Sequence, residues 1–392
     1  MKRKILSMVL VGAMGAVLLA GCGNAGSTEN AENTGGAGNT SQKEEAAAPQ
    51  ETEADVSAAP EENGDMAGAD AGNSDKVITG FDWLAEEEPD SMHYKEYEEK
   101  LGEITAEMVP EGFSIGVVSM ASSNDYWQDV NAGVQERCDE LGIEVAVQYC
   151  NGPADFEGQL TAAETLYNAK YDAYIFSPEG DANLVEITKK ITDEGYPVIN
   201  AYCSELADAT MYIGSIDSQT AIESAKKAIE IVGNDGIVAV AEGDVASKLA
   251  QTRTYYFMDY LKKNSNITVE EIPAQWDPTT ARTMTTDLLT ANPDVSYIWC
   301  NNDDLALGVY EGLREANATD KCTVVGTDGT SAGLNSVKSG EVYGTFWNNP
   351  VLIGKLSVDA CVRAAIGQDI PRVVMVDAEF VTVDSVDDYI KK

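Results

Sequence analysis

From Phe113 onward, short apolar runs alternate with amphipathic stretches, and this alternation constrains the fold more than any other feature of the chain. The first apolar runs are typical of strands and lie at Ser114–Ser119, Glu144–Tyr149, Ala173–Phe176 and 198–200. The stretches between them are typical of helices and lie at Asp125–Leu141, 154–169 and 183–194. A strand-helix alternation of this kind predicts a parallel sheet that is covered by helices on both faces.

A second series of the same kind follows the first. Its strands are expected at 236–241, 268–272, 296–300 and 322–327, and its helices at Asp217–Val232, 251–263, 279–289 and 305–316. The roughly 280 residues from Gly112 onward exceed what one hydrophobic core usually holds, so two lobes are expected. The predicted fold class is therefore α/β, with two doubly wound parallel-sheet lobes.

Aromatic, amide and carboxylate side chains are concentrated directly after the predicted strands. They lie at 119–127, 177–181, 200–203, 276–277, 301–304, 327–329 and 346–348. Ligands of doubly wound sheets bind beyond the carboxyl ends of the strands. Aromatic faces can cover the C–H face of a sugar ring, while Asp and Asn exchange hydrogen bonds with its hydroxyls. Each residue alone could equally cap a strand end or pack in the core, but together they favour a site for a polyol-like solute.

Two segments, NDDLALG at 302–308 and VGTDGT at 325–330, resemble those of the type I periplasmic binding proteins of the ribose and galactose class. The opening run GVVS at 116–119, with the polar and aromatic residues after it, is similar to the first strand of that family. The resemblance covers about residues 113–384. It implies two lobes joined by a three-strand hinge near 215–217, 348–350 and 373–377, and closure of the lobes about a ligand.

The resemblance also implies which residues bind. Ser119, Asn124, Tyr126 and Trp127 would line the cleft from the first lobe, and Trp276, Asn302, Asp328 and Asn348 from the second lobe and the hinge. Tyr202 and Gln251 stand where ribose-type relatives place charged ligand-binding residues, and Arg253 and Asp303 are further candidates. These departures argue against ribose itself.

The same departures lead to an expectation about charge. Asp328 and Asp303 are expected to lack a fixed counter-charge, because the resemblance places neither Arg253 nor Lys248 on a known contact. A buried carboxylate without such a partner is costly. The ligand is therefore expected to be a neutral sugar or polyol, or an amine, rather than an anion.

The first residues are typical of a bacterial lipoprotein signal. The positively charged residues Lys2, Arg3 and Lys4 come first, and an apolar run at 5–20 follows them. Residues 19–22 read LAGC, so that Cys22 directly follows the small residues at the end of the run. A run of about 16 residues is short for a transmembrane helix. Residues 1–21 are therefore expected to be removed and Cys22 to be lipidated, which would hold the protein on the outer face of the cell membrane by lipid alone.

The chain is then predicted to divide into four further parts: a tether at 22–75, an extension at 76–111, an N-terminal lobe at 112–215 plus 349–374, and a C-terminal lobe at 216–348 plus 375–392. The tether has 12 acidic residues against Lys43 and almost no branched apolar residues, so disorder is expected. In the extension, Tyr94, Tyr97, Leu101, Ile104 and Met108 share one predicted helix face. That face would pack on its own domain or dock onto a partner protein.

Charge and composition exclude several classes of partner. The chain carries a net charge of −40, of which −32 falls on residues 76–392, so nucleic acid is not an expected partner. The six cysteines after Cys22 form no CxxC pair. Buried thiols are expected, with a disulfide left open. No stretch resembles a calcium loop, so neither a metal nor a cofactor is expected.

The expected function is capture of the solute by a monomer and its delivery to an ABC transporter permease, and three other functions compete with it. An enzyme is disfavoured, because Asp303 and Asp304 are consecutive, the folded core has no histidine and no GxGxxG turn is present. A DNA-binding repressor is disfavoured by the charge and the signal. A sensor that presents a sugar or amine to a membrane receptor or histidine kinase remains the alternative.

The anchor yields a first testable prediction. Replacing Cys22→Ala should release the protein into the medium as folded material, because no other element of the tether is expected to bind membranes. Cell fractionation with an immunoblot measures this release, with the unchanged chain as the membrane-bound control. A variant that still sediments with membranes would contradict the assignment.

Overall fold

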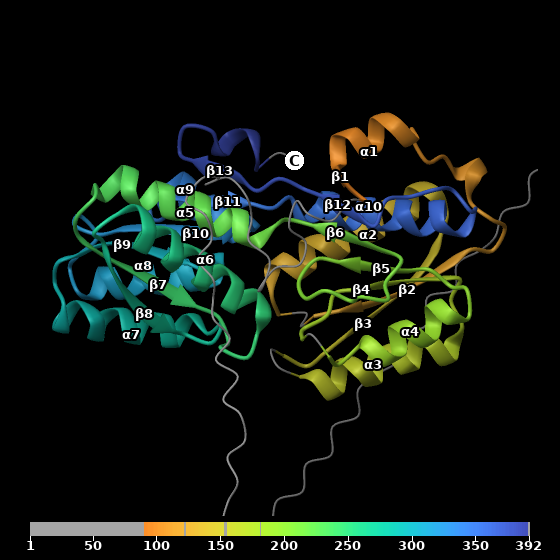
Figure 1. The fold of residues 1–392 in the computed structure, drawn as a ribbon, viewed down its shortest axis with the longest axis horizontal. Helices are drawn as coiled ribbons and strands as arrows, with labels where there is room; N and C mark the ends of the chain where they lie inside the picture. The colour runs from red at the N-terminus through yellow and green to blue at the C-terminus, as the bar shows by residue number, and fades with distance from the viewer. Residues whose placement is uncertain (1–89, 121–122, 153–154, 181, 391–392) are drawn as a thin grey trace, which may run out of the picture. The chain divides into compact units, whose positions relative to one another are not determined.

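The computed structural model describes residues 90–120, 123–152, 155–180 and 182–390, and it confirms the predicted α/β class (Figure 1). Two separate sheets are present, of seven and six strands. The described residues belong to a single compact unit. The signal at 1–21, Cys22 and the tether to residue 75 lie outside the described residues.

The first lobe is built on the seven-stranded sheet, whose order is β1-β12-β6-β5-β4-β2-β3 and whose strands are all parallel. The strands are β1 (Ser91–His93), β2 (Ser114–Ser119), β3 (Glu144–Tyr149), β4 (Ala173–Phe176), β5 (Val198–Ala201), β6 (Met211–Gly214) and β12 (Val373–Met375). Helices α2 (Asp125–Leu141) and α10 (Pro350–Ala365) contribute to one core layer, and α3 (Phe156–Ala169) and α4 (Val185–Asp193) to the other. Strand β4 is buried throughout, as expected for a sheet covered on both faces.

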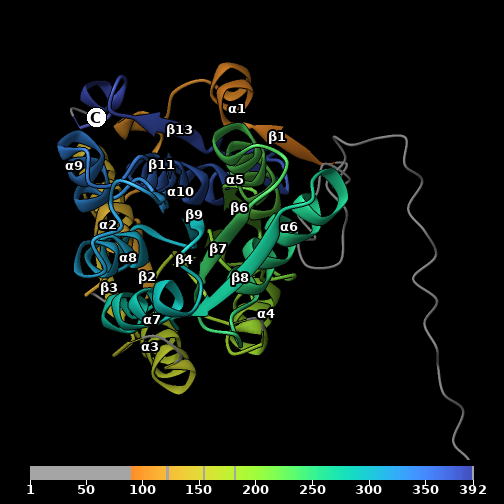
Figure 2. The ribbon, with the colours of Figure 1, turned by 90° about the vertical axis from the view of Figure 1, so that its left-hand side faces the viewer.

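The second lobe is built on the six-stranded sheet, in the order β13-β11-β10-β9-β7-β8, in which only β13 is antiparallel. Its strands are β7 (Ile237–Glu242), β8 (Thr268–Pro273), β9 (Val295–Cys300), β10 (Thr323–Asp328), β11 (Gly344–Trp347) and β13 (Glu379–Thr382). Helices α5 (Asp217–Val232) and α6 (Lys248–Asn264) cover one face, and α7 (Pro278–Ala291), α8 (Asp303–Glu315) and α9 (Ser331–Ser339) cover the other. Figure 2 looks onto this lobe, with α6 and α8 on opposite sides of β7.

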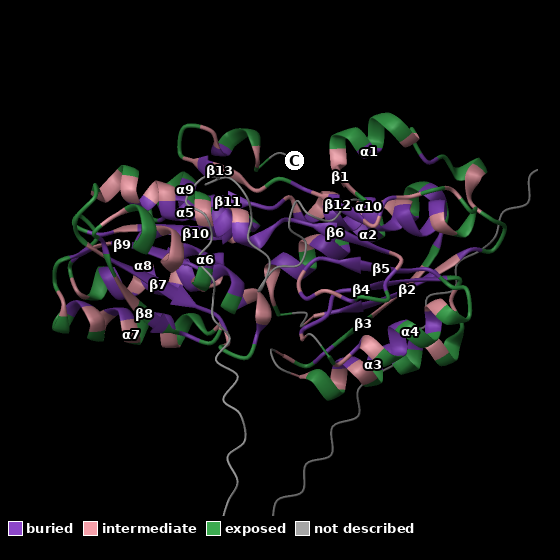
Figure 3. Cartoon of the chain, viewed as in Figure 1, coloured by how far each residue is buried: buried purple, intermediate pink, exposed green. Residues whose placement is uncertain are grey.

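The chain passes between the two sheets at three places. It leaves the first lobe between β6 and α5, returns between β11 and α10, and crosses again between β12 and β13. In Figure 3 the central strands of both sheets, such as β4, β5 and β10, are coloured as buried, whereas the outer helices present exposed faces to solvent. The carboxyl ends of the parallel strands therefore remain as the positions where a ligand could approach both lobes.

The extension before the first lobe contains a shorter helix than the apolar spacing predicts. Helix α1 (Tyr94–Leu101) ends at Gly102, whose φ of 73° lies in the left-handed region, and Met108 belongs to a separate 3₁₀ turn, Ala106–Met108. Even so, Tyr97 and Ile104 are both buried in the core of the first lobe. The apolar face thus packs on its own domain.

Arg363 of α10 holds the extension in place. Its guanidinium donates to the carbonyl oxygens of Leu101, at 3.2 Å, and Gly102, and its centre lies 5.3 Å from the centroid of the Tyr97 ring. These contacts satisfy the exposed carbonyls at the end of α1 with a buried cation. The extension is therefore part of the folded lobe.

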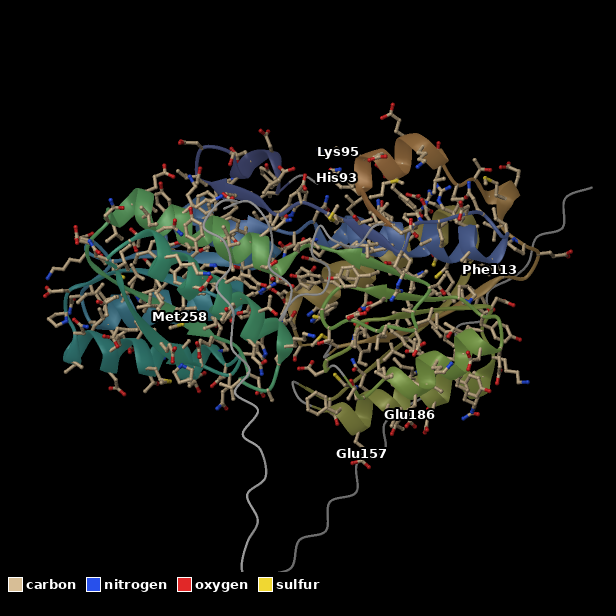
Figure 4. All side chains as sticks on the ribbon, viewed as in Figure 1. His93, Lys95, Phe113, Glu157, Glu186 and Met258 are labelled. Atoms are coloured by element: carbon tan, nitrogen blue, oxygen red, sulfur yellow. The ribbon has the colours of Figure 1, made fainter. Side chains whose placement is uncertain are left out.

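The extension also reaches the third crossing. Strand β1 pairs in parallel with β12, and the His93 Nε2 lies 2.8 Å from a carboxylate oxygen of Asp377, which follows β12. Figure 4 labels His93 and Lys95 at the start of α1. The first described strand thus lies directly beside one of the segments that join the lobes.

None of the helices in the described ranges combines the length and apolar composition that a membrane crossing requires. The six cysteines of the described part are all free thiols: Cys138, Cys150, Cys203, Cys300, Cys322 and Cys361. The disulfide that the sequence left open is absent from this part of the chain.

The packing of the extension gives a second prediction. Tyr97→Ala should lower the free energy of unfolding by about 3 to 5 kcal/mol, because it removes a fully buried aromatic side chain. Glu99→Ala, an exposed position on the same helix, should change it by less than about 0.5 kcal/mol. Urea denaturation of both variants measures the difference, and equal effects would show that the extension does not belong to the fold.

Candidate functional site

A cavity of about 470 Å³ is lined by residues that follow strands or begin helices in both lobes. This volume lies within the range of small-molecule sites. The lining residues are Met120, Ser123, Asn124, Tyr126, Trp127, Glu179, Tyr202, Cys203, Ser247, Leu249, Arg253, Gln275, Trp276, Asp277, Pro278, Asn302, Asp304 and Asp328. Among them are Asn124, Tyr126, Trp127, Tyr202, Arg253, Trp276, Asn302 and Asp328, which the sequence had singled out.

The first lobe contributes three aromatic rings to the wall. The Tyr126 and Trp127 rings meet edge to face, with centroids 5.0 Å apart and planes at 84°, and the Tyr202 centroid lies 5.6 Å from that of Tyr126. All three residues are buried. Among the described residues, the Tyr126 hydroxyl has no hydrogen-bond partner. The wall thus offers apolar ring surface together with a hydroxyl group that can hydrogen-bond to a ligand.

Two asparagines place helix starts at the cavity. Asn124 caps α2 by accepting from the Trp127 N–H at 3.3 Å, and Asn302 caps α8 by accepting from the Leu305 N–H at 2.9 Å. The Asn124 amide also donates to a carboxylate oxygen of Asp304 at 3.1 Å. Because Asn124 precedes α2 and Asp304 lies in α8, this hydrogen bond joins the two lobes across the cavity.

Strained backbone is concentrated at the cavity. Tyr202, Cys203, Gln275, Trp276 and Asp328 all have positive φ values, between 56° and 111°. Such conformations cost free energy in residues other than glycine and persist where the surroundings hold them, often at functional sites. The strain here directs the side chains that follow β5, β8 and β10.

The Trp276 ring depends on a glycine across from it. A Cβ atom on Gly243, directly after β7, would lie only 2.1 Å from ring atoms of Trp276. Glycine is therefore required at this position, because the indole packs directly on the backbone.

Arg253 corrects the expectation that Asp328 lacks a counter-charge. Its guanidinium is almost completely buried and donates to the carboxylates of Asp217, at 2.8 Å, and Asp328, at 3.4 Å. It also donates to the Tyr202 hydroxyl, at 2.6 Å, and to the Asn301 carbonyl. The sequence misled here because Arg253 is distant from both carboxylates along the chain, and only the fold brings them together.

The Tyr202 hydroxyl connects this network to the first lobe. It donates to Asp217 at 2.8 Å and accepts from Arg253 and from the Asn348 amide, the latter at 3.2 Å. Tyr202 follows β5 of the first lobe, whereas Asp217 begins α5 after the first crossing and Asn348 lies at the second crossing. The network therefore spans both lobes and two of the segments that join them.

The cavity remains acidic despite Arg253. Its described lining contains four carboxylates, Glu179, Asp277, Asp304 and Asp328, against this single cation. Burial raises the pKa of Asp328 well above its usual range, although Arg253 opposes the shift. Burial, with Asp125 nearby, also raises the pKa of Asp304. Neighbouring carboxylates contribute to both shifts, so an added negative charge would be disfavoured by the same repulsion.

Four predicted site residues do not line the cavity. Ser119 is buried and accepts from the Asn131 amide at 2.8 Å, and Gln251 is exposed and donates to the Val245 carbonyl at 2.7 Å. Asn348 lies behind Tyr202. Asp303 accepts from the N–H and hydroxyl of Thr330 and from the Thr345 hydroxyl, at 2.8, 3.0 and 2.6 Å. It therefore fastens α8 to the segments after β10 and in β11.

Four lining residues were outside every segment that the sequence singled out: Ser247, Leu249, Gln275 and Pro278. Ser247 and Leu249 lie after β7, so their position also agrees with binding beyond the carboxyl ends of the strands. Within the described ranges, no three His, Cys, Asp or Glu side chains come together as a possible metal site.

Comparisons with known proteins agree with this geometry. The family described as "Periplasmic binding protein domain" matches residues 115–369. The D-allose-binding periplasmic protein of Escherichia coli is 31% identical over 258 residues, which cover 62% of this chain and 83% of that protein. The ribose import binding protein of Haemophilus influenzae is 27% identical over 280 residues, which cover 69% and 91%.

Solved structures share the fold. A solute-binding protein from Actinobacillus succinogenes with bound D-allose has a TM-score of 0.65 at 24% identity, covering 71% of this chain and 100% of that one. One from Bacillus halodurans with bound myo-inositol has a TM-score of 0.66 at 23% identity, covering 71% and 98%. Fold and cavity together define a two-lobed type I binding protein. The chain belongs to the periplasmic binding protein family.

Asp303 gives a third prediction, which concerns pH. Burial raises the pKa of Asp303 to about 7, although the hydrogen bonds from the two threonines lower it. Because this value lies above that of an exposed aspartate, about 3.9, the folded protein binds the proton more tightly than the unfolded chain. The contribution of Asp303 to the free energy of unfolding should therefore fall as the pH rises from about 4 to about 7.

Asp303→Asn removes this titration. Urea denaturation across that pH range should show that the wild-type stability, relative to that of Asp303→Asn, decreases steadily with rising pH. A difference that stays constant across the range would contradict a buried, titrating Asp303.

Proposed function

We propose that the protein captures a small neutral sugar or polyol in this cavity and delivers it to the permease of an ABC-type importer. The observation that carries the proposal is the composition of the wall, in which aromatic rings stand beside amide and carboxylate groups contributed by both lobes. Rings can cover the C–H faces of a sugar, while the polar groups exchange hydrogen bonds with its hydroxyls. The sugar-binding names of the relatives support the same class of ligand.

Capture is proposed to work by closure. Three crossing segments join the lobes, which is the arrangement that permits a hinge motion about a ligand. A ligand that contacts both walls stabilises only the closed state, and about 10⁴-fold tighter binding to that state converts a mostly open population into a mostly closed one. The closed form would then be the one that the permease recognises.

The acidity of the cavity supports a neutral ligand. Arg253 is already engaged by Asp217, Asp328, Tyr202 and the Asn301 carbonyl, so it offers little positive charge to an incoming anion. Glu179 and Asp304 add negative charge to the same wall. A carboxylate or phosphate on the ligand would therefore be repelled, whereas hydroxyl or amino groups would supply donors.

The same residues support binding rather than catalysis. The single histidine of the chain, His93, lies in the extension and does not line the cavity. The pKa of the Cys203 thiol is raised well above its usual range, mainly by burial and also by the nearby Glu179 carboxylate. The thiol is therefore not a reactive thiolate. Lipidation at Cys22 would keep the protein on the outer face of the membrane, beside the permease.

A fourth prediction tests the proposed ligand class. Isothermal calorimetry on the full chain, after a thermal-shift screen of sugars and polyols, should find a neutral ligand that binds at least about tenfold tighter than its sugar-acid counterpart. Trp127→Ala should weaken this binding by about 1 to 3 kcal/mol through lost ring contact. Tyr255→Ala, an exposed aromatic outside the cavity, serves as the control.

Two results would contradict the proposal. Tight binding of a sugar acid would show that the polarity of the site has been misread. Binding of the neutral sugar that is unchanged in Trp127→Ala would place the ligand elsewhere on the protein.

A further inference from the structure

One part of the cavity wall differs in chemistry from the rest. Met120, Cys203 and Leu249, called here the sulfur patch, line the cavity side by side with polar and aromatic residues. Met120 follows β2, Cys203 lies after β5, and Leu249 belongs to the first turn of α6. The patch is therefore assembled from both lobes.

The three side chains share an apolar environment. The Cys203 Sγ lies 3.7 Å from the Met120 Sδ, and all three side chains pack against the apolar core of the first lobe. Each is only half-buried, unlike the core residues behind it. The patch thus lies where the apolar core of the first lobe, together with Leu249 of the second lobe, reaches the cavity.

The sulfur patch cannot supply the hydrogen bonds that water makes with a hydroxyl group of the ligand. A thioether is a weak acceptor, a protonated thiol is a weak donor, and leucine offers neither. Burial keeps the Cys203 thiol protonated by raising its pKa. A ligand hydroxyl placed against the patch would lose its water partners without gaining protein partners of similar strength, whereas a methyl group would gain apolar contact.

We propose that the sulfur patch is a specificity subsite that receives a methyl or methylene group of the ligand, so the preferred ligand is a deoxy sugar or a deoxy polyol. The proposal rests on the proposed function, because it assigns one edge of the sugar to this patch. The remaining edges meet the amides and carboxylates elsewhere in the lining, such as Asn124, Asn302 and Asp304. An apolar subsite of this kind rejects an added hydroxyl by about 10- to 100-fold.

Matched pairs of sugars that differ by one hydroxyl test the proposal. Calorimetry on the full chain compares D-fucose with D-galactose, L-rhamnose with L-mannose, and 6-deoxy-D-glucose and 2-deoxy-D-glucose with D-glucose. In the pair that binds best, the deoxy sugar should bind at least about tenfold tighter than its parent.

Substitutions in the patch should erase this preference. Cys203→Ser replaces the thiol with a hydroxyl of nearly the same size and should reduce the ratio to below about threefold, and Met120→Gln should act in the same direction. Cys150→Ser is the matched control, because Cys150 is buried outside the cavity and its thiol already donates to the Gly152 carbonyl, at 3.5 Å. This control should keep the wild-type ratio.

A chemical readout separates failure of this proposal from failure of the proposed function. Cys203 is the one half-buried cysteine of the six in the described part, and burial keeps its thiol protonated, so methylmercury, which displaces a thiol proton, is a suitable label whose adduct is located by peptide mass spectrometry. Any sugar that occupies the cavity should slow this labelling. A parent sugar that protects Cys203 and binds as tightly as its deoxy partner would overturn the subsite while leaving sugar capture intact. If no sugar of any pair binds or protects Cys203, sugar capture itself fails, and the subsite fails with it.

Discussion

The buried guanidinium of Arg253 is the interaction on which the arrangement of the site depends. A charge removed from water is costly unless strong partners surround it, and here two carboxylates, a tyrosine hydroxyl and a main-chain carbonyl do so. These partners come from the end of β5, the start of α5 and the ends of β9 and β10. Because these partners surround one cation, the ends of four strands or helices are held together at the cavity.

The sequence predicted the fold well because its strongest signals are local and periodic. Long amphipathic helices such as α2 and α5 were predicted with the bounds that they have in the structure. By contrast, β6 was not predicted, because no amphipathic helix separates it from β5 and it therefore falls outside the strand-helix alternation. Helix α10 was also not singled out, although Asn349 and Pro350 form a typical helix start.

The site was predicted in part, and the errors have geometric causes. Residues 251 and 253 are about 200° apart around a helix, so only one of them can face the cleft. The resemblance favoured the position of Gln251, whereas the structure places Arg253 inside. The neighbouring residues Asp303 and Asp304 also differ in direction. Asp304 lines the cavity, whereas Asp303 fastens α8 to β11 from behind. Spacing along the chain shows that such residues point in different directions, but not which one points inward.

The position of β1 beside β12 has a mechanical consequence. The described part of the chain begins next to the third crossing, where strand pairing and the His93–Asp377 contact hold it, and not at the far end of either lobe. Points close to a rotation axis move little when two bodies rotate about it. A pull on the chain before residue 90 would therefore exert only a small torque on the lobes. Attachment at this point would allow the protein to be held at a surface while the proposed opening and closing of its lobes met little resistance from whatever holds it.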